Sequence, residues 1–237
     1  MAYDIPEVAA AMDRKILQLD TMTNNLANAG TPGFKAEHLH FLKTLAEGNN
    51  ATANPQSSNS VLVDFAQGLS QRTDNPLDLH IQGEGFFVVQ TKEGQAFTRK
   101  GDLTVNKLNQ IVTQAGDPVI GEGGPITLRN GKIHISEDGS VYVDESQVGK
   151  LKLVDFANRQ SLSKTGDGLY RDPGVAGMKK VDKPNISSGF IELSNVNIVR
   201  EMADMIDIHR TFENYQKIIQ TLSELDKLST GRIGRVA

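Results

Sequence analysis

The sequence predicts an α+β protein in which a long helix at each end of the chain flanks an all-β domain of short strands. Two observations support this fold class: apolar residues recur at helical spacing near both termini, and the middle region alternates short apolar segments with turn residues. A chain of 237 residues is long enough for one domain with substantial extensions. We expect an N-terminal helix within 1–35, a linker or extended segment over 36–75, the β domain over 76–185 and a C-terminal helix within 186–237.

The N-terminal helix is predicted over residues 4–28. Its apolar side chains follow one another at intervals of three or four residues and share one face: Ile5, Val8, Met12, Ile16, Leu19, Met22 and Leu26. Pro6 is tolerated because the N–H of a first-turn residue has no partner within the helix. At the other end, Gly30 is placed to take the left-handed conformation that closes many helices.

A turn is predicted directly after this helix. Pro32 and Gly33 suit the two central positions of a type II turn, and Phe34 then supplies one large apolar anchor. Three asparagines precede the turn, and their amides would compete for backbone groups in a helix interior: Asn24, Asn25 and Asn28. These features fit either a simple helix stop or a shaped corner in which the amides fix the helix end against a neighbour.

The middle of the chain is predicted to be a series of short strands, without room for helical crossovers. These strands cover residues 85–90, 95–99, 102–106, 110–113, 132–136, 140–144 and 149–154. The residues Glu137-Asp138-Gly139 form a hairpin turn between two of them. The 22 glycines indicate many turns, and residues 44–60 have the composition of a flexible linker.

The C-terminal helix is predicted to begin after Asn197, its N-cap. Its main apolar stripe is Ile198, Met202, Met205, Ile208, Phe212, Tyr215, Ile219 and Leu222. Four further apolar residues fall off this stripe: Val199, Ile206, Ile218 and Leu225. The two terminal helices could pair with each other, either parallel or antiparallel. Because such a pair still leaves apolar surface uncovered, we expect something outside the chain to complete it.

Composition and charge exclude several classes of function. The chain carries 25 Lys and Arg against 29 Asp and Glu, a net charge of −4, which does not favour a nucleic-acid partner. It has no cysteine, so it forms neither disulfides nor thiolate metal sites. No apolar run reaches the length that membrane insertion requires, and the N-terminus lacks the features of a cleaved secretory signal.

Nothing in the sequence indicates catalysis or a cofactor. Glu37, His38 and His40 are close together, but without a second cluster at ligand spacing they are interpreted as linker or surface residues rather than as a metal site. The glycine-rich stretches 83–85 and 121–124 do not open a helix after a strand, so they lack the geometry of a phosphate loop. The polar face of the N-terminal helix is acidic, unlike that of a membrane-surface helix.

Three separated stretches resemble the flagellar rod and hook proteins. TNNLANAGTPGFKAE (23–37) is similar to the N-terminal signature of that family, and the stretch that begins SNVNIVREMADMI at Ser194 is similar to its C-terminal helix. Between them, NPLDLHIQGEGFFVVQT (75–91), FTRKGDLTVN (97–106) and GDPVIGEGGPI (116–126) look like the β domain of the rod proteins. The resemblance covers nearly the whole chain. It is greatest to the proximal rod members, with the distal ones as the alternative.

The resemblance implies a structural subunit, not an enzyme, that needs no cofactor. It implies a core domain in which both termini come together like a coiled coil, with the β domain outside it, in a torque-transmitting shaft of the flagellar basal body. It also implies partners, namely other copies of the chain and neighbouring rod proteins, and export through the flagellar type III apparatus without a cleaved signal. No nucleic acid and no membrane insertion are expected.

We expect two groups of residues to carry assembly. Packing between subunits should come from the helices, through Met12, Leu19, Leu26, Met205, Ile206, Phe212 and Ile219. The corner between helix and linker should be fixed by Asn24, Asn25, Asn28, Pro32, Gly33 and Phe34. Two alternatives remain open: a soluble coiled-coil dimer whose β domain binds a partner or ligand, and a β-fold enzyme with a pocket of converging titratable groups.

Overall fold

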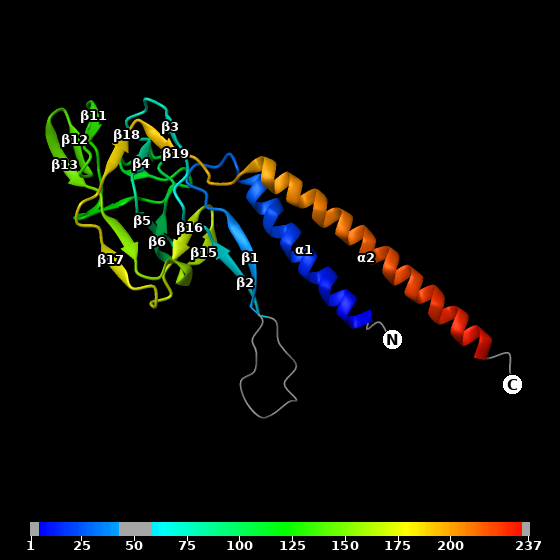
Figure 1. Ribbon diagram of the computed structural model, residues 1–237. Coiled ribbons are helices and arrows are strands. Elements are labelled where there is room, and N and C mark those ends of the chain that lie inside the picture. The colour runs from blue at the N-terminus through cyan, green and yellow to red at the C-terminus, as the bar shows by residue number, and fades with distance from the viewer. Residues whose placement is uncertain (1–4, 43–57, 234–237) are drawn as a thin grey trace. The chain divides into compact units, whose positions relative to one another are not determined.

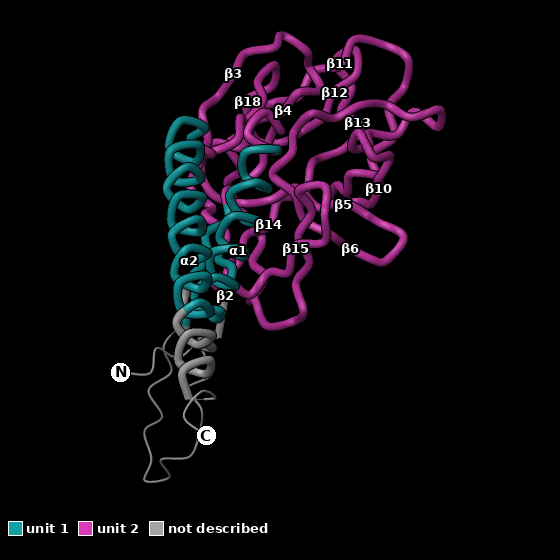
Figure 2. Tube along the Cα trace, turned by 90° about the vertical axis from the view of Figure 1, so that its right-hand side faces the viewer, with its two compact units in different colours: residues 1–27, 37–62, 197–237 teal, residues 28–36, 63–196 magenta. Residues whose placement is uncertain are grey.

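The computed structural model describes residues 5–42 and 58–233, and Figure 1 shows their helices and strands. The chain divides into two compact units, which Figure 2 colours separately. The helical unit comprises residues 1–27, 37–62 and 197–237, and the β unit comprises residues 28–36 and 63–196. Most of the linker expected over 44–60 lies outside the described residues.

The helical unit contains helix α1 (Ile5–Ala27), strand β1 (Glu37–Leu42), most of strand β2 (Ser58–Val63) and helix α2 (Ile198–Ile233). The helices lie side by side and antiparallel, since Asn25 in the last turn of α1 donates to Glu201 in the first turn of α2 (Figure 1). β1 pairs with β2 and lies against α1. At 1.5 Å per residue, the 23 residues of α1 span about 34 Å and the 36 residues of α2 about 54 Å.

The first turn of α2 confirms the predicted N-cap. The Asn197 Oδ1 accepts a hydrogen bond of 3.1 Å from the backbone N–H of Arg200, which would otherwise lack a partner at the helix start. The end of α1 differs from the prediction. Gly30 does not take the left-handed conformation; instead α1 ends at Ala27, and Thr31 N donates to Asn28 O in a turn of 3.0 Å.

The β unit is built around an antiparallel six-stranded sheet in the order β15-β16-β6-β5-β14-β17. Its strands are β5 (Phe86–Thr91), β6 (Gly94–Thr98), β14 (Leu153–Phe156), β15 (Ser163–Gly166), β16 (Leu169–Arg171) and β17 (Met178–Lys180). Short ribbons surround it: β3 (Ser70–Arg72) with β19 (Phe190–Glu192), β4 (Leu79–Ile81) with β18 (Ile186–Ser188), β7 (Thr104–Val105) with β8 (Ile111–Val112), and β9 (Ile120–Gly121) with β10 (Gly124–Pro125). A three-stranded sheet contains β11 (Ile133–Ile135), β12 (Ser140–Val143) and β13 (Ser146–Lys150), and a 3-10 turn η1 covers Arg159–Ser161.

Strand β5 has a hydrophobic core on each of its faces. Successive side chains of a strand point to opposite sides, so Phe87 and Val89 enter one core while Phe86 and Val88 enter the other. All four side chains are buried. A continuous apolar run therefore occupies the centre of the sheet, as expected for a strand that is covered on both sides.

Most predicted strands agree with the structure, and one does not. The hairpin turn at 137–139 joins β11 to β12, with Gly139 at a φ of 81°. The single strand predicted over 149–154 is wrong, because the chain there leaves one sheet and enters another. β13 ends at Lys150 on its pairing with β12, whereas β14 begins at Leu153 and pairs with β5.

The β unit is larger than the 76–185 expected for it. Residues 28–36, 63–75 and 186–196 also belong to it, because β3 pairs with β19 and β18 pairs with β4. The segment expected to be a linker or extended, 36–75, contains the three strands β1, β2 and β3 among its described residues. The β3–β19 and β4–β18 pairings join segments that are more than a hundred residues apart, which local sequence patterns do not reveal.

Candidate assembly site

Most of the predicted packing residues of the helical unit are partly buried. The half-buried ones are Met12, Leu19, Leu26, Met205, Phe212 and Ile219, and Ile208 is the residue of the α2 stripe that is fully buried among those described. Side chains of this kind retain apolar area that a further helix can cover. They remain proposed assembly residues.

Part of the α2 surface is apolar and exposed. We call Ile198, Val199, Met202 and Ile206 the α2 patch. At 100° per residue these four side chains fall within an arc of about 100° on the helix. Val199 is 78% exposed and Ile206 is 55% exposed. The expectation that Val199, Ile206 and Ile218 lie off the buried stripe is confirmed, but the spacing placed Ile198 and Met202 on that stripe, and the structure exposes them.

Asn25 is the central polar residue of the helical unit. Its Nδ2 donates to the backbone oxygen of Glu37 at 2.8 Å and to the Glu201 carboxylate at 3.2 Å, while its Oδ1 accepts from the N–H of Glu37 at 2.9 Å. Asn24 donates to the Glu37 carboxylate at 3.0 Å. The Asn25 side chain is buried, and these bonds join the end of α1, the start of β1 and the start of α2. Its amide is therefore a structural connector rather than an exposed contact.

The Thr-Pro-Gly-Phe turn lies within the β unit. Gly33 has a φ of 66°, and Phe34 N donates to Thr31 O at 3.3 Å, as the predicted type II turn requires. The Thr31 hydroxyl donates to the Asn28 side-chain oxygen at 3.3 Å, and Pro32 is half-buried. A Cβ on Gly33 would lie 2.6 Å from the backbone carbon of Arg99, so the close approach of two backbones demands glycine here.

Phe34 is buried and is the apolar anchor that the sequence indicated. The Lys164 ammonium lies 4.3 Å from the centre of its ring, in a cation–π contact. Both Gly33 and Phe34 are buried by contacts inside the β unit. They fix the conformation of the segment 31–35 from within the β unit.

Lys35 and Glu192 form a buried ion pair that the sequence interpretation missed. The Lys35 Nζ lies 2.6 Å from the Glu192 Oε1, with side-chain exposures of 0% and 1%. Burial lowers the pKa of Lys35, and the neighbouring Glu192 carboxylate opposes that shift. One sequence signal could have indicated this pair: Lys35 directly follows Phe34, which was expected to be a buried anchor. A lysine that is buried with its neighbour needs a carboxylate as a partner. Nothing local indicates which carboxylate that is.

Asn195 joins the two terminal signatures within the β unit. Its Oδ1 accepts from Ala36 N at 2.8 Å, and its Nδ2 donates to Asp64 O at 2.9 Å and to Ala66 O at 3.2 Å. Gly33 N donates to the backbone oxygen of Glu192 at 2.7 Å. The Pro-Gly-Phe-Lys stretch near the N-terminus and the Ser-Asn-Val stretch near the C-terminus are therefore halves of one structural junction.

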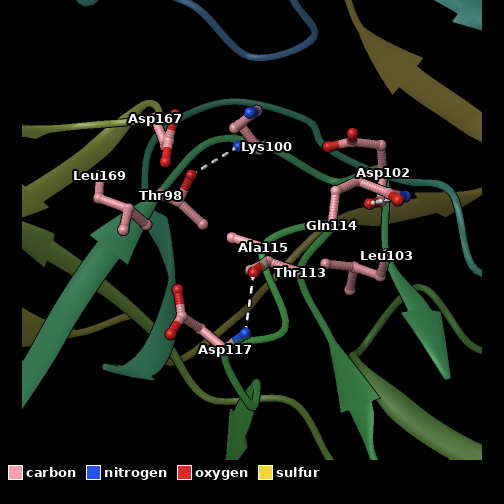
Figure 3. Close-up of a pocket in the computed structure, with 10 residues that line it drawn as sticks. All are labelled: Thr98, Lys100, Asp102, Leu103, Thr113, Gln114, Ala115, Asp117, Asp167 and Leu169. Atoms are coloured by element: carbon pink, nitrogen blue, oxygen red, sulfur yellow. Dashed lines mark hydrogen bonds between the residues drawn. The ribbon is translucent and has the colours of Figure 1, made fainter. Parts of the chain in front are cut away.

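The β unit also contains a cavity of about 290 Å³, shown in Figure 3. Its charged lining residues are Lys100, Asp102, Asp117 and Asp167. Burial raises the pKa of Asp102. Thr113 Oγ1 accepts from the backbone N–H of Asp117 at 3.2 Å, and Thr98 Oγ1 accepts from that of Lys100 at 3.0 Å. The two threonine hydroxyls thus accept from the loop backbone, and the Thr98 hydroxyl also donates to Gly168 O. Histidine is not among the residues that line this cavity.

The described residues contain no group of three or more His, Asp and Glu side chains that could hold a metal ion. Glu37, the first residue of the triplet considered in the sequence, instead accepts the hydrogen bond from Asn24. Within the described part of the chain, no helix combines the length and apolar character needed to cross a bilayer.

Comparison with known proteins decides the family. Residues 9–35 match the description "Flagella basal body rod protein", residues 80–143 match "Flagellar hook protein FlgE/F/G D1 domain", and residues 187–230 match "Flagellar basal body rod FlgEFG protein C-terminal". The flagellar basal-body rod protein FlgF of Caulobacter vibrioides is 35% identical over 92% of this chain and 93% of its own length. The chain belongs to the flagellar basal-body rod protein family.

Other rod proteins extend this similarity. FlgF of Salmonella typhimurium is 35% identical over 94% of this chain and 95% of its own length. FlgG of Bacillus subtilis is 31% identical over 88% of this chain and 90% of its own length. The stronger similarity to FlgF is consistent with the proximal rod type. This is a family of structural proteins, and the prediction that the chain is not an enzyme is confirmed by its membership.

The family matches coincide with the structural junctions. The N-terminal match ends at Lys35, which forms the buried ion pair, and the C-terminal match includes Glu192, Asn195 and the α2 patch. The cavity of Figure 3 lies in the β unit, and part of its lining falls within the match to the D1 domain. In a rod protein the residues of interest are therefore those that fix the conformation of the terminal segments and those that present apolar surface on the helices.

Proposed function

We propose that this chain is a structural subunit of the flagellar basal-body rod and that it polymerises through its terminal helices to build a torque-transmitting shaft. Family membership supports the rod assignment. The observation that supports polymerisation through the helices is the α2 patch, four apolar side chains exposed at the start of a helix of 36 residues. An exposed apolar surface of this kind is typical of an interaction site.

Burial of the α2 patch would favour association with a neighbouring subunit. Full burial of one such side chain contributes about 1.5–3 kcal/mol, and these side chains are roughly half to three-quarters exposed. A contact between two different surfaces, repeated without closing a ring, produces an open helical assembly. Several weak helix contacts per subunit then add up to a stiff tube.

The finer arrangement belongs to the same proposal. The antiparallel α1–α2 pair is the starting point of a coiled-coil-like core domain, to which helices of neighbouring subunits add through the half-buried residues Met12, Leu19, Phe212 and Ile219. The corner residues Asn24, Asn25, Asn28, Pro32, Gly33 and Phe34 hold the chain between α1 and β1 in one conformation. They support the interface from within their own subunit.

The partners proposed for the chain are other copies of itself, the adjacent rod proteins and the flagellar export apparatus. Its proposed location is the basal body, in the rod that spans the periplasm, and export through the flagellar apparatus would need no cleaved signal. The alternative of a closed coiled-coil dimer whose β domain binds a ligand gains no support from the family assignment.

The experiment replaces Ile206 with aspartate in a bacterium that carries this gene. Ile206→Asp puts a charge into the α2 patch, and because the side chain is exposed the fold should remain intact by circular dichroism. We expect loss of motility in soft agar and no rods in purified basal bodies. Gln216→Asp, which adds the same charge at another exposed position of α2, is the control and should leave cells motile. Normal rods in the Ile206→Asp strain would show that the α2 patch does not carry assembly.

Phe212→Asp tests the half-buried stripe in the same assay. It should leave the β unit folded and abolish assembly and motility, because a carboxylate between packed helices has no partner. Sedimentation of the purified wild-type chain distinguishes the rod subunit from the alternative of a closed coiled-coil dimer. A rod subunit should be largely monomeric in dilute solution, and a stable closed dimer would favour the alternative.

A further inference from the structure

The segment 33–36 is held in the β unit by partners that lie far along the chain. Lys35 donates to Glu192 across 157 residues, and Ala36 N donates to Asn195 across 159 residues. Gly33 N donates to the backbone oxygen of Glu192. Because a chain is synthesised from its N-terminus, the segment 33–36 exists long before the residues that hold it.

One carboxylate oxygen connects three stretches of the chain. Glu192 Oε1 accepts from Lys35 Nζ at 2.6 Å and from Gly68 N at 2.9 Å. The Lys35 Nζ also donates to Ala66 O at 2.6 Å, and Asn195 donates to the same oxygen at 3.2 Å. We call Lys35, Ala66, Gly68, Glu192 and Asn195 the closing cluster. Removal of Glu192 from it would leave the Lys35 ammonium with Ala66 O but without its anion, and would leave the N–H of Gly68 without its acceptor.

Charge makes the closing cluster cooperative. Arg99 is buried beside it, with its Nη1 3.8 Å from the Glu192 Oε2, so Glu192 is the anion between two cations. Without that anion, docking of the segment 33–36 would bury the Lys35 ammonium next to the Arg99 guanidinium. The desolvation cost of a buried ion is repaid only when its partner is in place. Docking of the N-terminal segment is therefore unfavourable until Glu192 arrives.

We infer that the Lys35–Glu192 pair is an electrostatic lock, which couples docking of the segment 33–36 to arrival of the segment 192–195. The β unit then closes last at this junction, and only on a chain that is present as far as Asn195. Local elements such as the β5–β6 hairpin, in which Gln90 pairs with Gln95, need no such delay. The lock is a conformational device that does not depend on the proposed mode of assembly.

The order of closure is tested on the full-length wild-type chain by pulsed hydrogen exchange during refolding. We expect the amides of Ala36 and Gly68 to gain protection in one common phase, after the amides of the β5–β6 hairpin. Both amides are bound directly to side chains of the C-terminal segment, Asn195 and Glu192. Protection of Ala36 before Gly68, or together with the hairpin, would overturn the inference.

The role of the charge is tested by native-state hydrogen exchange of Glu192→Gln, which keeps the shape of the side chain but removes the anion. The amides of Gly33, Ala36 and Gly68 should exchange together at least about 100-fold faster, while β5 amides stay protected. Glu122→Gln, which removes a carboxylate from an exposed pair with Lys180, is the matched control and should change none of these amides. Acceleration confined to Gly68 would overturn the coupling.

A second variant keeps the test decisive if Glu192→Gln does not fold. The double substitution Lys35→Met/Glu192→Gln removes both charges of the pair and keeps a side-chain oxygen that can accept from Gly68 N. Such a chain should fold and should recover at least tenfold of the protection that Glu192→Gln loses, because no lysine ammonium is then buried beside the Arg99 guanidinium. If Glu192→Gln and Lys35→Met/Glu192→Gln expose the segment 33–36 equally, pairing of charge is not what closes the junction.

Discussion

Asn25 and Glu37 exchange two hydrogen bonds, in which the asparagine side chain acts as a peptide group added to the edge of β1. The Asn25 Nδ2 donates to Glu37 O at 2.8 Å, and Glu37 N donates to the Asn25 Oδ1 at 2.9 Å. Only a carboxamide supplies both a donor and an acceptor in this geometry. The relationship explains why an asparagine, a poor residue for a helix interior, occupies the last turn of α1.

Asn25→Asp should destabilise the helical unit, because the aspartate loses the donor and faces the Glu201 carboxylate, which Asn25 contacts at 3.2 Å. The expected loss in the free energy of unfolding is about 1–3 kcal/mol. Urea denaturation measures it, and exchange of the Glu37 amide locates it. Thr23→Asp, which adds the same charge on the exposed side of the same turn, should cost less than about 1 kcal/mol. Equal losses in the two variants would contradict this role for Asn25.

Gly33→Ala should destabilise the β unit strongly, whereas Gly30→Ala should not. At Gly33 the φ of 66° and the backbone of Arg99 at 2.6 Å both oppose a Cβ, and a strained position of this kind costs on the order of 1–3 kcal/mol. A Cβ at Gly30 meets nothing within 4 Å, and its backbone is not left-handed. Thermal or urea unfolding of the two variants measures the contrast. A Gly33→Ala chain as stable as Gly30→Ala would refute the close approach of the two backbones.

His80 should make the β unit less stable in mild acid. Burial lowers its pKa below the ordinary 6.5; the Arg99 and Lys35 cations lower it further, and the Glu192 carboxylate opposes them. The unfolded chain therefore takes up a proton below pH 6.5 that the folded chain does not, and stability falls as the pH falls through that value. The slope reaches at most about 1.4 kcal/mol per pH unit for one proton.

The measurement is the free energy of unfolding between pH 7.5 and pH 5. His80→Gln should show a shallower loss than the wild type, because glutamine does not titrate. His134→Gln, at an exposed position of β11, should keep the wild-type dependence. An unchanged profile in His80→Gln would show that other groups control the acid response.

Asn197→Ala should fray the first turn of α2. The substitution removes the acceptor that satisfies Arg200 N, and loss of an N-cap costs about 1 kcal/mol. Hydrogen exchange of the Arg200 and Glu201 amides should accelerate, with less change beyond the second turn. Asn197→Asp keeps a side-chain oxygen at the cap and should preserve protection. If both variants fray α2 alike, the cap is not what defines its start.

The elements that the sequence predicted well are those with a local period or a local turn. The spacing of Met12, Leu19 and Leu26 gave α1 within a residue or two of its observed ends, and Asn197 marked the start of α2. The Pro32-Gly33 turn needed only the preferences of those two residues. Each of these signals concerns hydrogen bonds between residues that are close in the chain.

The predictions failed where one segment is satisfied by another that is far away. The segment 149–154 has the composition of a single strand, but it divides between two sheets whose other strands were not known. No local sequence pattern indicated that Glu192 would be the buried partner of Lys35.

The sequence by itself determined two long apolar helices, a middle of short strands and the signatures that place the chain among the rod proteins. Periodicity and turn preferences act over a few residues, so they can be recognised in the amino-acid sequence. Only the tertiary structure decided that Lys35 meets Glu192, that Asn25 completes the edge of β1, and that Ile198 and Met202 stay uncovered. Those facts depend on which distant segments pack against each other and remove one another's side chains from water. Such burial exists only once the chain has folded.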